Sequence, residues 1–503
     1  MTTFGVRVMS SLPPQVESFL SLSHELYING RTVRSQSSER LTIYNPATGQ
    51  EIASVADANE QDVDAAVNAA HQAYQSGVWR TMPASERERI LLRLAELVER
   101  DADILAYLET LEQGKSIHIA KGLEVAGTLS WIRYVAGLAT KITGSTFDVS
   151  IPMPAGARYT AYTLHEPVGV VAGIIPWNFP LLIGVWKVLP ALAAGCCVIA
   201  KPAETTPLTI LYLAALATEA GVPDGVFNVV TGRGSVAGNS LVNHPLVAKV
   251  SFTGSTPVGK HIARSCSDTL KRFSLELGGK NPAIVLPDAD LEQTVPGLML
   301  ASFLNQGQVC AACSRIYVTP ELFKPLSSAL ADAVTSMTVG AGLDPTAQIN
   351  PLVSLSQQQK VSAYIDKAPL EAEHVIKGKH GPNPAGYYVQ PTLIINPAPT
   401  AACITDEIFG PVLTLTQVAD TDEAIRLANN SPYGLAASVW TQNLQAAMSL
   451  PRLIEAGTVW VNSHVMIDPA MPFGGYKQSG VGHDFGADWL KSFMHQKSIC
   501  IRY

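Results

Sequence analysis

Residues 167–186 read PVGVVAGIIPWNFPLLIGVW, and the interpretation of this uncharged stretch decides the fold. Its length alone would suit a membrane helix. However, Pro176 and Pro180 interrupt the run, and each removes a helix hydrogen bond that lipid cannot replace. We therefore predict a buried strand, a turn around Asn178 and a buried helix, and no membrane span.

Similar apolar segments follow. GVVAGIIP, CVIAKP, VFNVVTG and VAKVSFTG are typical of short buried strands, and helical runs separate them. In the run TTPLTILYLAALATEAGVP, Thr206 is expected to cap the helix and Gly221 to end it. Upstream, Ser85 and Glu88 form a capping-box pattern. The alternation predicts a doubly wound parallel sheet, which binds ligands at the carboxyl ends of its strands.

The rest of the chain indicates further units. A second alternating region runs from about 283 to 478, and 503 residues are enough for two or three domains. Two predicted strands, ARYTAYTL (157–164) and KSICIRY (497–503), lie outside both α/β regions. If they pair, they form an edge that can add to another subunit.

Composition narrows the function classes. The net charge is −7 with no long basic run, so we expect neither nucleic acid nor an acidic membrane surface as a partner. The seven cysteines are scattered, which fits a reducing compartment and not a disulfide framework. The first twenty residues contain no long apolar core and no cleavage signal, so we expect a cytoplasmic protein.

Two segments resemble phosphate-binding loops. FTGSTPVGKH (252–261) nearly matches the loop of nucleotide triphosphatases, but His261 stands where Ser or Thr must ligate magnesium. A strand that turns into a helix is the better interpretation, and its free amides would suit a dinucleotide pyrophosphate. Gly232 and Gly234 do not have the G-x-G-x-x-G spacing, which favours a plain turn.

The segment AKPAETTP follows a predicted strand. Lys201 and Glu204 therefore lie at a carboxyl end, where the ribose of a dinucleotide would bind. Glu204 would accept bonds from ribose hydroxyls and repel a 2′-phosphate, which favours NAD over NADP. Two solvated charges on a loop remain an equal alternative at this point.

Two thiols stand three residues apart in QVCAACSR (308–315). Cys310 and Cys313 can be a redox dithiol, half of a zinc site, two buried helix residues, or one nucleophile beside a bystander. Zinc needs two further ligands, for which no second pair is visible, so we predict no metal site. A nucleophile needs an oxyanion donor, a base and a field that lowers its pKa; Asn178 and Glu276 are candidates for the first two.

The order of seven motifs resembles that of the NAD(P)-dependent aldehyde dehydrogenase superfamily over almost the whole chain. They are PWNFP (176–180), KPAE (201–204), FTGS (252–255), LELGGK (275–280), GQVC (307–310), EIFGP (407–411) and PFGGYKQSG (472–480). The resemblance implies that Cys310 attacks an aldehyde, that Asn178 and the Cys310 amide bind the oxyanion, and that Glu276 activates the hydrolytic water.

The resemblance also implies the cofactor and the domains. The cofactor would be NAD, with Lys201 and Glu204 at the adenosine ribose, and the remaining contacts would be Gly234, Ser255, Glu407, Phe409, Trp177 and Gly254. The expected fold is α/β: an NAD-binding domain (24–143 and 168–278), a catalytic domain (279–478) and an oligomerisation arm (144–167 and 484–503). Dimers or dimers of dimers, that is homotetramers, are expected.

Within this superfamily the chain is most similar to the bacterial phenylacetaldehyde dehydrogenases, for example in LETLEQGKSI, SFLNQGQVCAACSRIY and GTVWVNSH. Phe179, Trp186 and Phe473 would line a tunnel for an arylalkyl aldehyde, unless they only fill the core. Leu304 stands where some relatives have a second aromatic residue. The rivals are broader aldehyde specificity, CoA-dependent acyl transfer, and an inactive member that kept the fold.

Overall fold

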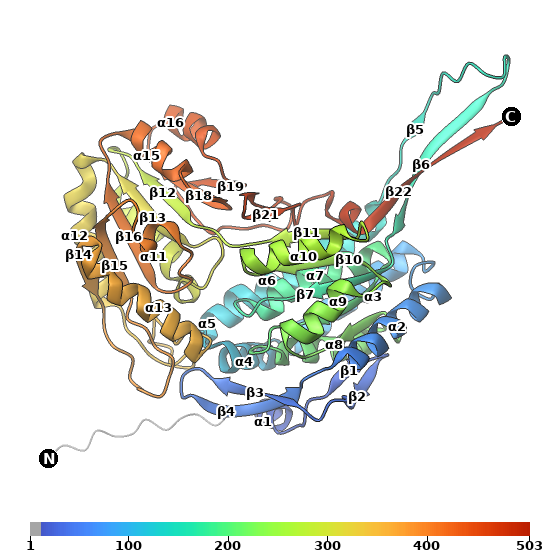
Figure 1. Ribbon diagram of the computed structural model, residues 1–503, viewed down its shortest axis with the longest axis horizontal. Helices are drawn as coiled ribbons and strands as arrows, with labels where there is room; N and C mark the ends of the chain where they lie inside the picture. Colours follow the sequence, from blue (N-terminus) through green and yellow to red (C-terminus); the bar gives the residue numbers. More distant parts are fainter. Residues whose placement is uncertain (1–11) are drawn as a thin grey trace.

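An eight-stranded sheet is the core of the first half of the computed structural model, which describes residues 12–503 (Figure 1). Its five central strands are parallel, as predicted, and antiparallel strands flank them. The spatial order is β2 (Arg31–Val33), β1 (Leu26–Ile28), β9 (Phe227–Val229), β8 (Cys197–Lys201), β7 (Val170–Ile174), β10 (Val247–Thr253), β11 (Arg272–Glu276) and β21 (Gly480–Val481).

The stretch 167–186 contains the predicted strand, turn and helix. Strand β7 is followed by helix α7 (Pro180–Ala194), which is buried over its whole length. Pro180 suits the first turn, where no amide is required, and Gly195 ends the helix at a φ of 92°. Among residues 12–503, no helix has the length and apolar character that crossing a membrane requires. Most of the segment used to judge export, residues 1–11, lies outside the described residues.

Helices cover both faces of this sheet (Figure 1). The principal ones besides α7 are α2 (Glu60–Ser76), α3 (Ala84–Arg100), α4 (Ala102–Gln113), α6 (Ala126–Leu138), α8 (Leu208–Ala220) and α10 (Thr256–Ser267), while α1 (Pro14–Leu20) and α9 (Asn239–Asn243) are shorter.

Both predicted N-terminal helix caps are wrong, whereas Gly221 ends α8 as predicted, at a φ of 106°. Helix α3 begins at Ala84, after Pro83, so Ser85 lies inside the first turn and cannot cap it. Helix α8 begins after Pro207, and the Thr206 hydroxyl is buried without a partner. The amides of Leu208 and Thr209 donate instead to the buried carboxylate of Glu112, which is distant in the sequence.

A seven-stranded sheet forms the second α/β unit. In spatial order it contains β14 (Ala372–Lys377), β15 (Thr392–Pro397), β16 (Val412–Gln417), β13 (Cys313–Val318), β12 (Asn281–Val285), β18 (Ala436–Trp440) and β19 (Thr458–Val461). All neighbours are parallel except β14 and β15. Its main helices are α11 (Leu291–Phe303), α12 (Pro320–Ser336), α13 (Leu355–Lys367) and α15 (Thr421–Asn429).

The two strands that lay outside the α/β regions pair with each other. β6 (Tyr159–Pro167) and β22 (Met494–Arg502) are antiparallel over their full length, and β5 (Thr146–Phe147) joins the other edge of β6. They form an arm that projects from the body of the molecule and carries the C-terminus (Figure 1).

The connection from β11 to β12 joins the two sheets. Glu276 is the last residue of β11, and Asn281 is the first residue of β12. Asn281 pairs with Cys313 at the start of β13. The carboxyl ends of the first sheet therefore meet the amino end of the second, and the loop that carries Cys310 lies at this junction.

Candidate active site

Cys310 lines two cavities of different character. One, which we call the polar cavity, has charged and polar side chains among apolar ones in its lining and a volume of about 200 Å³; the other, the apolar cavity, is lined mainly by apolar side chains and has a volume of about 320 Å³. Cys310 as a residue is partly exposed, whereas Cys313 is buried at the start of β13. The structure therefore brings Cys310, and not Cys313, to the wall of both cavities.

The polar cavity lies beyond the carboxyl ends of β7 and β10. Besides Cys310, six of the predicted site residues line it: Trp177, Asn178, Gly254, Ser255, Glu407 and Phe409. The Trp177 and Phe409 rings meet edge to face, with centroids 5.2 Å apart. Gly278 permits close packing here, because a Cβ atom at that position would lie 2.2 Å from the Glu407 carboxylate.

The apolar cavity lies beside helices α6 and α7. Phe179, Trp186 and Phe473 all line it, so the structure brings together the three residues predicted to contact substrate. Sequence reasoning missed Trp131, Val465 and Ile467, which come from α6 and from the loop before Phe473. Leu304 also lines the cavity, which has therefore both aromatic and aliphatic walls.

The backbone around Cys310 is held by Asn281. Its side-chain amide donates to the Cys310 carbonyl at 2.8 Å and to the Ala312 carbonyl at 2.9 Å. Burial, with the nearby carboxylates of Glu276 and Glu407, raises the pKa of the Cys310 thiol to about 12. The predicted positive field is therefore not supplied by the described residues, whose net effect opposes ionisation.

Glu276 is buried at the end of β11, and its Oε2 has no hydrogen-bond partner. Burial raises the pKa of this carboxyl well above its ordinary value, and the charge of Asp484 raises it further, whereas Lys187 acts in the opposite direction. The predicted desolvation is therefore present. A carboxyl whose pKa is raised is, in its ionised form, a stronger base than an exposed glutamate, as a general base requires.

Asn178 lies in the turn between β7 and α7. Its side-chain Nδ2 donates to the Gln308 carbonyl at 3.0 Å. An amide nitrogen carries two protons, so this bond fixes the orientation of the group and leaves one donor available. Because Asn178 and Cys310 line the same cavity, that donor can serve an oxyanion formed beside the sulfur.

Lys201, Glu204 and Gly234 form a separate polar cluster. The Gly234 amide donates to Glu204 Oε1 at 2.5 Å, and Lys201 Nζ lies 3.6 Å from the same oxygen. Although burial alone would raise it, the Lys201 charge and the Gly234 amide lower the pKa of Glu204 below its ordinary value. Glu204 is therefore an anion that can accept hydrogen bonds, and the interpretation of Gly234 as a plain turn was incomplete.

The start of α10 offers free amides beside the polar cavity. Ser255 precedes the helix, but its side chain makes no capping bond. The unpaired amides and the helix dipole favour an anion at this end. His261 lies inside α10, so the near match to a triphosphatase loop is a strand that turns into a helix.

Sequence reasoning also missed two residues of α13, Gln357 and Lys360, which line the polar cavity. The Gln357 side chain donates to the carbonyl of Phe409 at 2.8 Å, and Lys360 donates to that of Glu407 at 3.2 Å. Phe409 has a φ of 61°, which is uncommon for a bulky residue. The two α13 side chains thus hold a strained loop in place. No local sequence motif predicts these contacts.

The other interpretations of the two thiols fit less well. Cys313 opens a strand and not a helix, so the pair is not two helix residues. Its sulfur is oriented toward the Arg315 carbonyl, at 3.7 Å. Within residues 12–503, no cluster of three or more His, Cys, Asp or Glu side chains is arranged to hold a metal ion.

Comparisons with known proteins agree with this geometry. Residues 32–499 match the model of the aldehyde dehydrogenase family. The phenylacetaldehyde dehydrogenase of Pseudomonas fluorescens is 48% identical over 98% of this chain and 99% of its own. Human retinal dehydrogenase 2 is 40% identical over 95% of this chain and 92% of its own.

A solved NAD⁺ complex of an aldehyde dehydrogenase from Bacillus cereus superposes with a TM-score of 0.94 at 42% identity, covering 98% of this chain and 99% of that one. The two α/β units and the projecting arm are thus the expected fold. On the extent of these matches and on the arrangement of its sheets, the chain belongs to the aldehyde dehydrogenase family.

Proposed function

We propose that this protein oxidises phenylacetaldehyde to phenylacetate with NAD as the oxidant. The observation that carries the proposal is the position of Cys310, which lines a polar cavity on one side and an aromatic-walled cavity on the other. A nucleophile there can contact an aldehyde and a nicotinamide at the same time.

In the first stage the Cys310 thiolate adds to the aldehyde carbon and forms a thiohemiacetal. The Asn178 side chain and the Cys310 backbone amide donate to the oxygen that becomes negative. Loss of a hydride from the same carbon then leaves an acyl thioester on Cys310. NAD, when bound, accepts this hydride and supplies a positive charge that favours the thiolate.

In the second stage Glu276 removes a proton from water, which attacks the thioester carbonyl. The C–S bond breaks and the acid leaves, giving its own proton to solvent to become the carboxylate, while the proton held by Glu276 returns to the sulfur or to solvent. The buried carboxyl suits this step because its raised pKa makes it a stronger base than an exposed glutamate.

The residues present fit a dinucleotide. The free amides at the start of α10 suit a pyrophosphate, Lys201 and Glu204 suit the adenosine ribose with Gly234 beside them, and the Glu407–Phe409 loop suits the nicotinamide ribose. The ionised Glu204 would repel a 2′-phosphate. We therefore expect a much higher kcat/KM with NAD than with NADP, and comparable values would contradict this assignment.

The substrate is inferred from the cavity walls and from the relative named as a phenylacetaldehyde dehydrogenase. Aromatic side chains favour an aryl group through stacking and burial. The test is kcat/KM for phenylacetaldehyde, benzaldehyde and hexanal, measured by NADH absorbance. A preference for phenylacetaldehyde supports the proposal, and a clear preference for hexanal would replace it with a broad aliphatic specificity.

Two other functions make different predictions in the same assay. A CoA-acylating enzyme needs no hydrolytic base, so NADH formation only after addition of CoA would overturn the role of Glu276. If the protein is an inactive member of the family, none of the aldehydes in the panel should lead to NADH formation. The joint presence of Cys310, Glu276 and Asn178 around one junction favours the hydrolytic enzyme.

We further propose that the arm joins subunits into a dimer or a dimer of dimers. β22 lies at the edge of the three-stranded sheet, so its outer side can pair with another chain. Sedimentation of the intact protein should give a mass that is two or four times that of the chain. A monomer would remove this assignment and leave the catalytic proposal untouched.

A further inference from the structure

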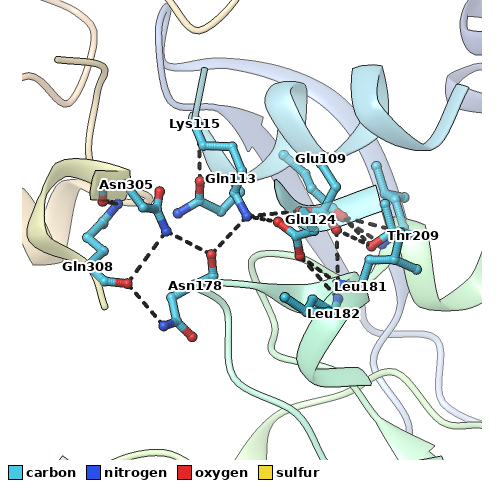
Figure 2. A network of polar contacts seen from close by, with 12 residues as sticks. Glu109, Gln113, Lys115, Glu124, Asn178, Leu181, Leu182, Thr209, Asn305 and Gln308 are labelled. Atoms are coloured by element: carbon cyan, nitrogen blue, oxygen red, sulfur yellow. Dashed lines mark hydrogen bonds and ion pairs between the residues drawn. The ribbon is translucent and has the colours of Figure 1, made fainter. Parts of the chain in front are cut away.

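A buried ionic cluster lies behind the turn that carries Asn178 (Figure 2). The side chains of Lys115, Glu109 and Glu124 are fully buried. Lys115 Nζ pairs with Glu109 at 3.3 Å and also with Glu124. Burial of three charges is costly unless their geometry and hydrogen bonds compensate it, so each contact of this cluster matters.

The ammonium group of Lys115 contacts two neighbouring residues of the candidate site. It donates to the Asn178 carbonyl at 2.9 Å and lies 4.5 Å from the centroid of the Phe179 ring. Asn178 carries the proposed oxyanion donor, and Phe179 lines the apolar cavity. One cation therefore fixes the backbone of the first residue and the ring of the second.

The two carboxylates hold the start of α7. This helix has no capping side chain of its own, and its N-terminal amides need acceptors. The Leu181 amide donates to Glu109 at 3.0 Å and to Glu124 at 3.1 Å, and the Leu182 amide donates to Glu124 at 3.3 Å. The turn with Asn178 is thus tied to the cluster on its helix side as well.

The loop before Cys310 contacts Asn178 from the side opposite to Glu109 and Glu124 (Figure 2). Asn305 Nδ2 donates to the Asn178 carbonyl at 2.9 Å, and the Asn178 side chain donates to the Gln308 carbonyl. Asn305 and Gln306 have φ values of 48° and 57°, so this loop is strained. Strain of this kind persists only where surrounding contacts determine the conformation.

We propose that Lys115, together with Glu109 and Glu124, is the positioning residue of the oxyanion hole, holding Asn178 against the Cys310 loop. The inference rests on the role proposed for Asn178 above. Lys115 touches neither sulfur nor aldehyde; it acts by fixing the Asn178 carbonyl, so that the side-chain amide keeps its place.

The first test is Lys115→Met, assayed with phenylacetaldehyde and saturating NAD. We expect kcat to fall by about 10- to 100-fold, since a displaced oxyanion donor loses most of its effect, while the KM for NAD changes little. The matched control is Lys271→Met: Lys271 is also buried and donates to two backbone carbonyls, those of Val242 and His244. The control should retain kcat.

A second variant keeps the inference testable if Lys115→Met does not fold. Lys115→Met alone leaves two buried carboxylates without their cation, which is strongly destabilising. Lys115→Met combined with Glu124→Gln keeps the net charge of the three residues and leaves one carboxylate instead of two without a cation, and the glutamine oxygen can still accept from the α7 amides. The double variant should fold and show the same fall in kcat.

The decisive readout is coupling to Asn178. In an Asn178→Ala background the Lys115 substitutions should lower kcat by less than about twofold, because their effect passes through the missing amide. If Lys115→Met retains kcat, or if its full effect persists in that background, the inference is overturned. If Asn178→Ala itself leaves kcat unchanged, the proposed oxyanion role fails instead, which is a distinguishable result.

Discussion

The two cavities that meet at Cys310 are built in different ways. The polar cavity is formed by loops that follow parallel strands, by the loop of Glu407 and Phe409 and by side chains of α13, and Gly278 allows the Glu407 carboxylate to approach closely. The apolar cavity is formed by the faces of α6 and α7 and by the loop before Phe473. From this difference we propose that the ends of the sheet supply the chemistry and that the helix faces select the aldehyde.

The largest effect should come from the sulfur that both cavities share. Cys310→Ala should lower kcat by about 10⁴-fold or more, because no other group can carry the acyl intermediate. Cys313→Ala should retain most activity, since its sulfur lies in β13. Steady-state assays of both variants test this, and an equal loss would favour a dithiol mechanism.

The next effect separates hydrolysis from acyl formation. Glu276→Gln should lower kcat by about 10²- to 10³-fold and leave a rapid first turnover of NADH. In the native enzyme, kcat should rise with pH through the raised pKa of Glu276, because the ionised form is the base. A pH profile that is the same in the variant and the native enzyme would exclude this role.

Ionisation of Glu276 should raise kcat but lower the free energy of unfolding, so the two quantities should change in opposite directions with pH. A carboxyl whose pKa is raised in the folded state binds its proton more tightly there than in the unfolded chain. Its contribution to the free energy of unfolding is therefore present at low pH and lost as the pH rises from 4.5 through the raised value. Urea unfolding at several pH values, compared with Glu276→Gln, measures this contribution.

A matched pair of substitutions tests whether the apolar cavity binds the aldehyde and the polar cavity binds NAD. Phe473→Leu, on the apolar side, should lower the preference for phenylacetaldehyde over hexanal by about tenfold, because an aromatic contact is lost. Phe409→Leu, on the polar side, should raise the KM for NAD and leave that preference unchanged. The comparison fails if both substitutions change aldehyde preference equally.

The smallest expected effect concerns cofactor choice. Glu204→Gln removes the charge that opposes a 2′-phosphate, so the ratio of kcat/KM for NADP to that for NAD should rise by roughly three- to tenfold. The side chain is 44% exposed, and solvent screening keeps the change modest. An unchanged ratio would mean that Glu204 does not face the ribose.

The sequence was most informative where chemistry lies at strand ends. Carboxyl ends of parallel strands share one edge, so Lys201 and Glu204 could be assigned to a ligand site from their position after an apolar run. The pairing of β6 with β22 was foreseen as a possibility because both predicted strands lie outside the α/β regions, and the structure confirms it.

Long-range placement could not be predicted in this way. Gln357 and Lys360 reach the polar cavity from a helix of the second unit, and Trp131 reaches the apolar cavity from α6. The predicted cap of α8 was wrong because Glu112, a remote residue, accepts the bond from the Leu208 amide. Local patterns contain no information about such partners.

The central claim is that a single sulfur carries the acyl group between the two cavities. Glu276→Gln protein, mixed with phenylacetaldehyde and NAD, should form one equivalent of NADH per subunit, and intact-mass and peptide mass spectrometry should find one phenylacetyl group on Cys310. An adduct on Cys313, or NADH formation with no acylated cysteine, would contradict the account.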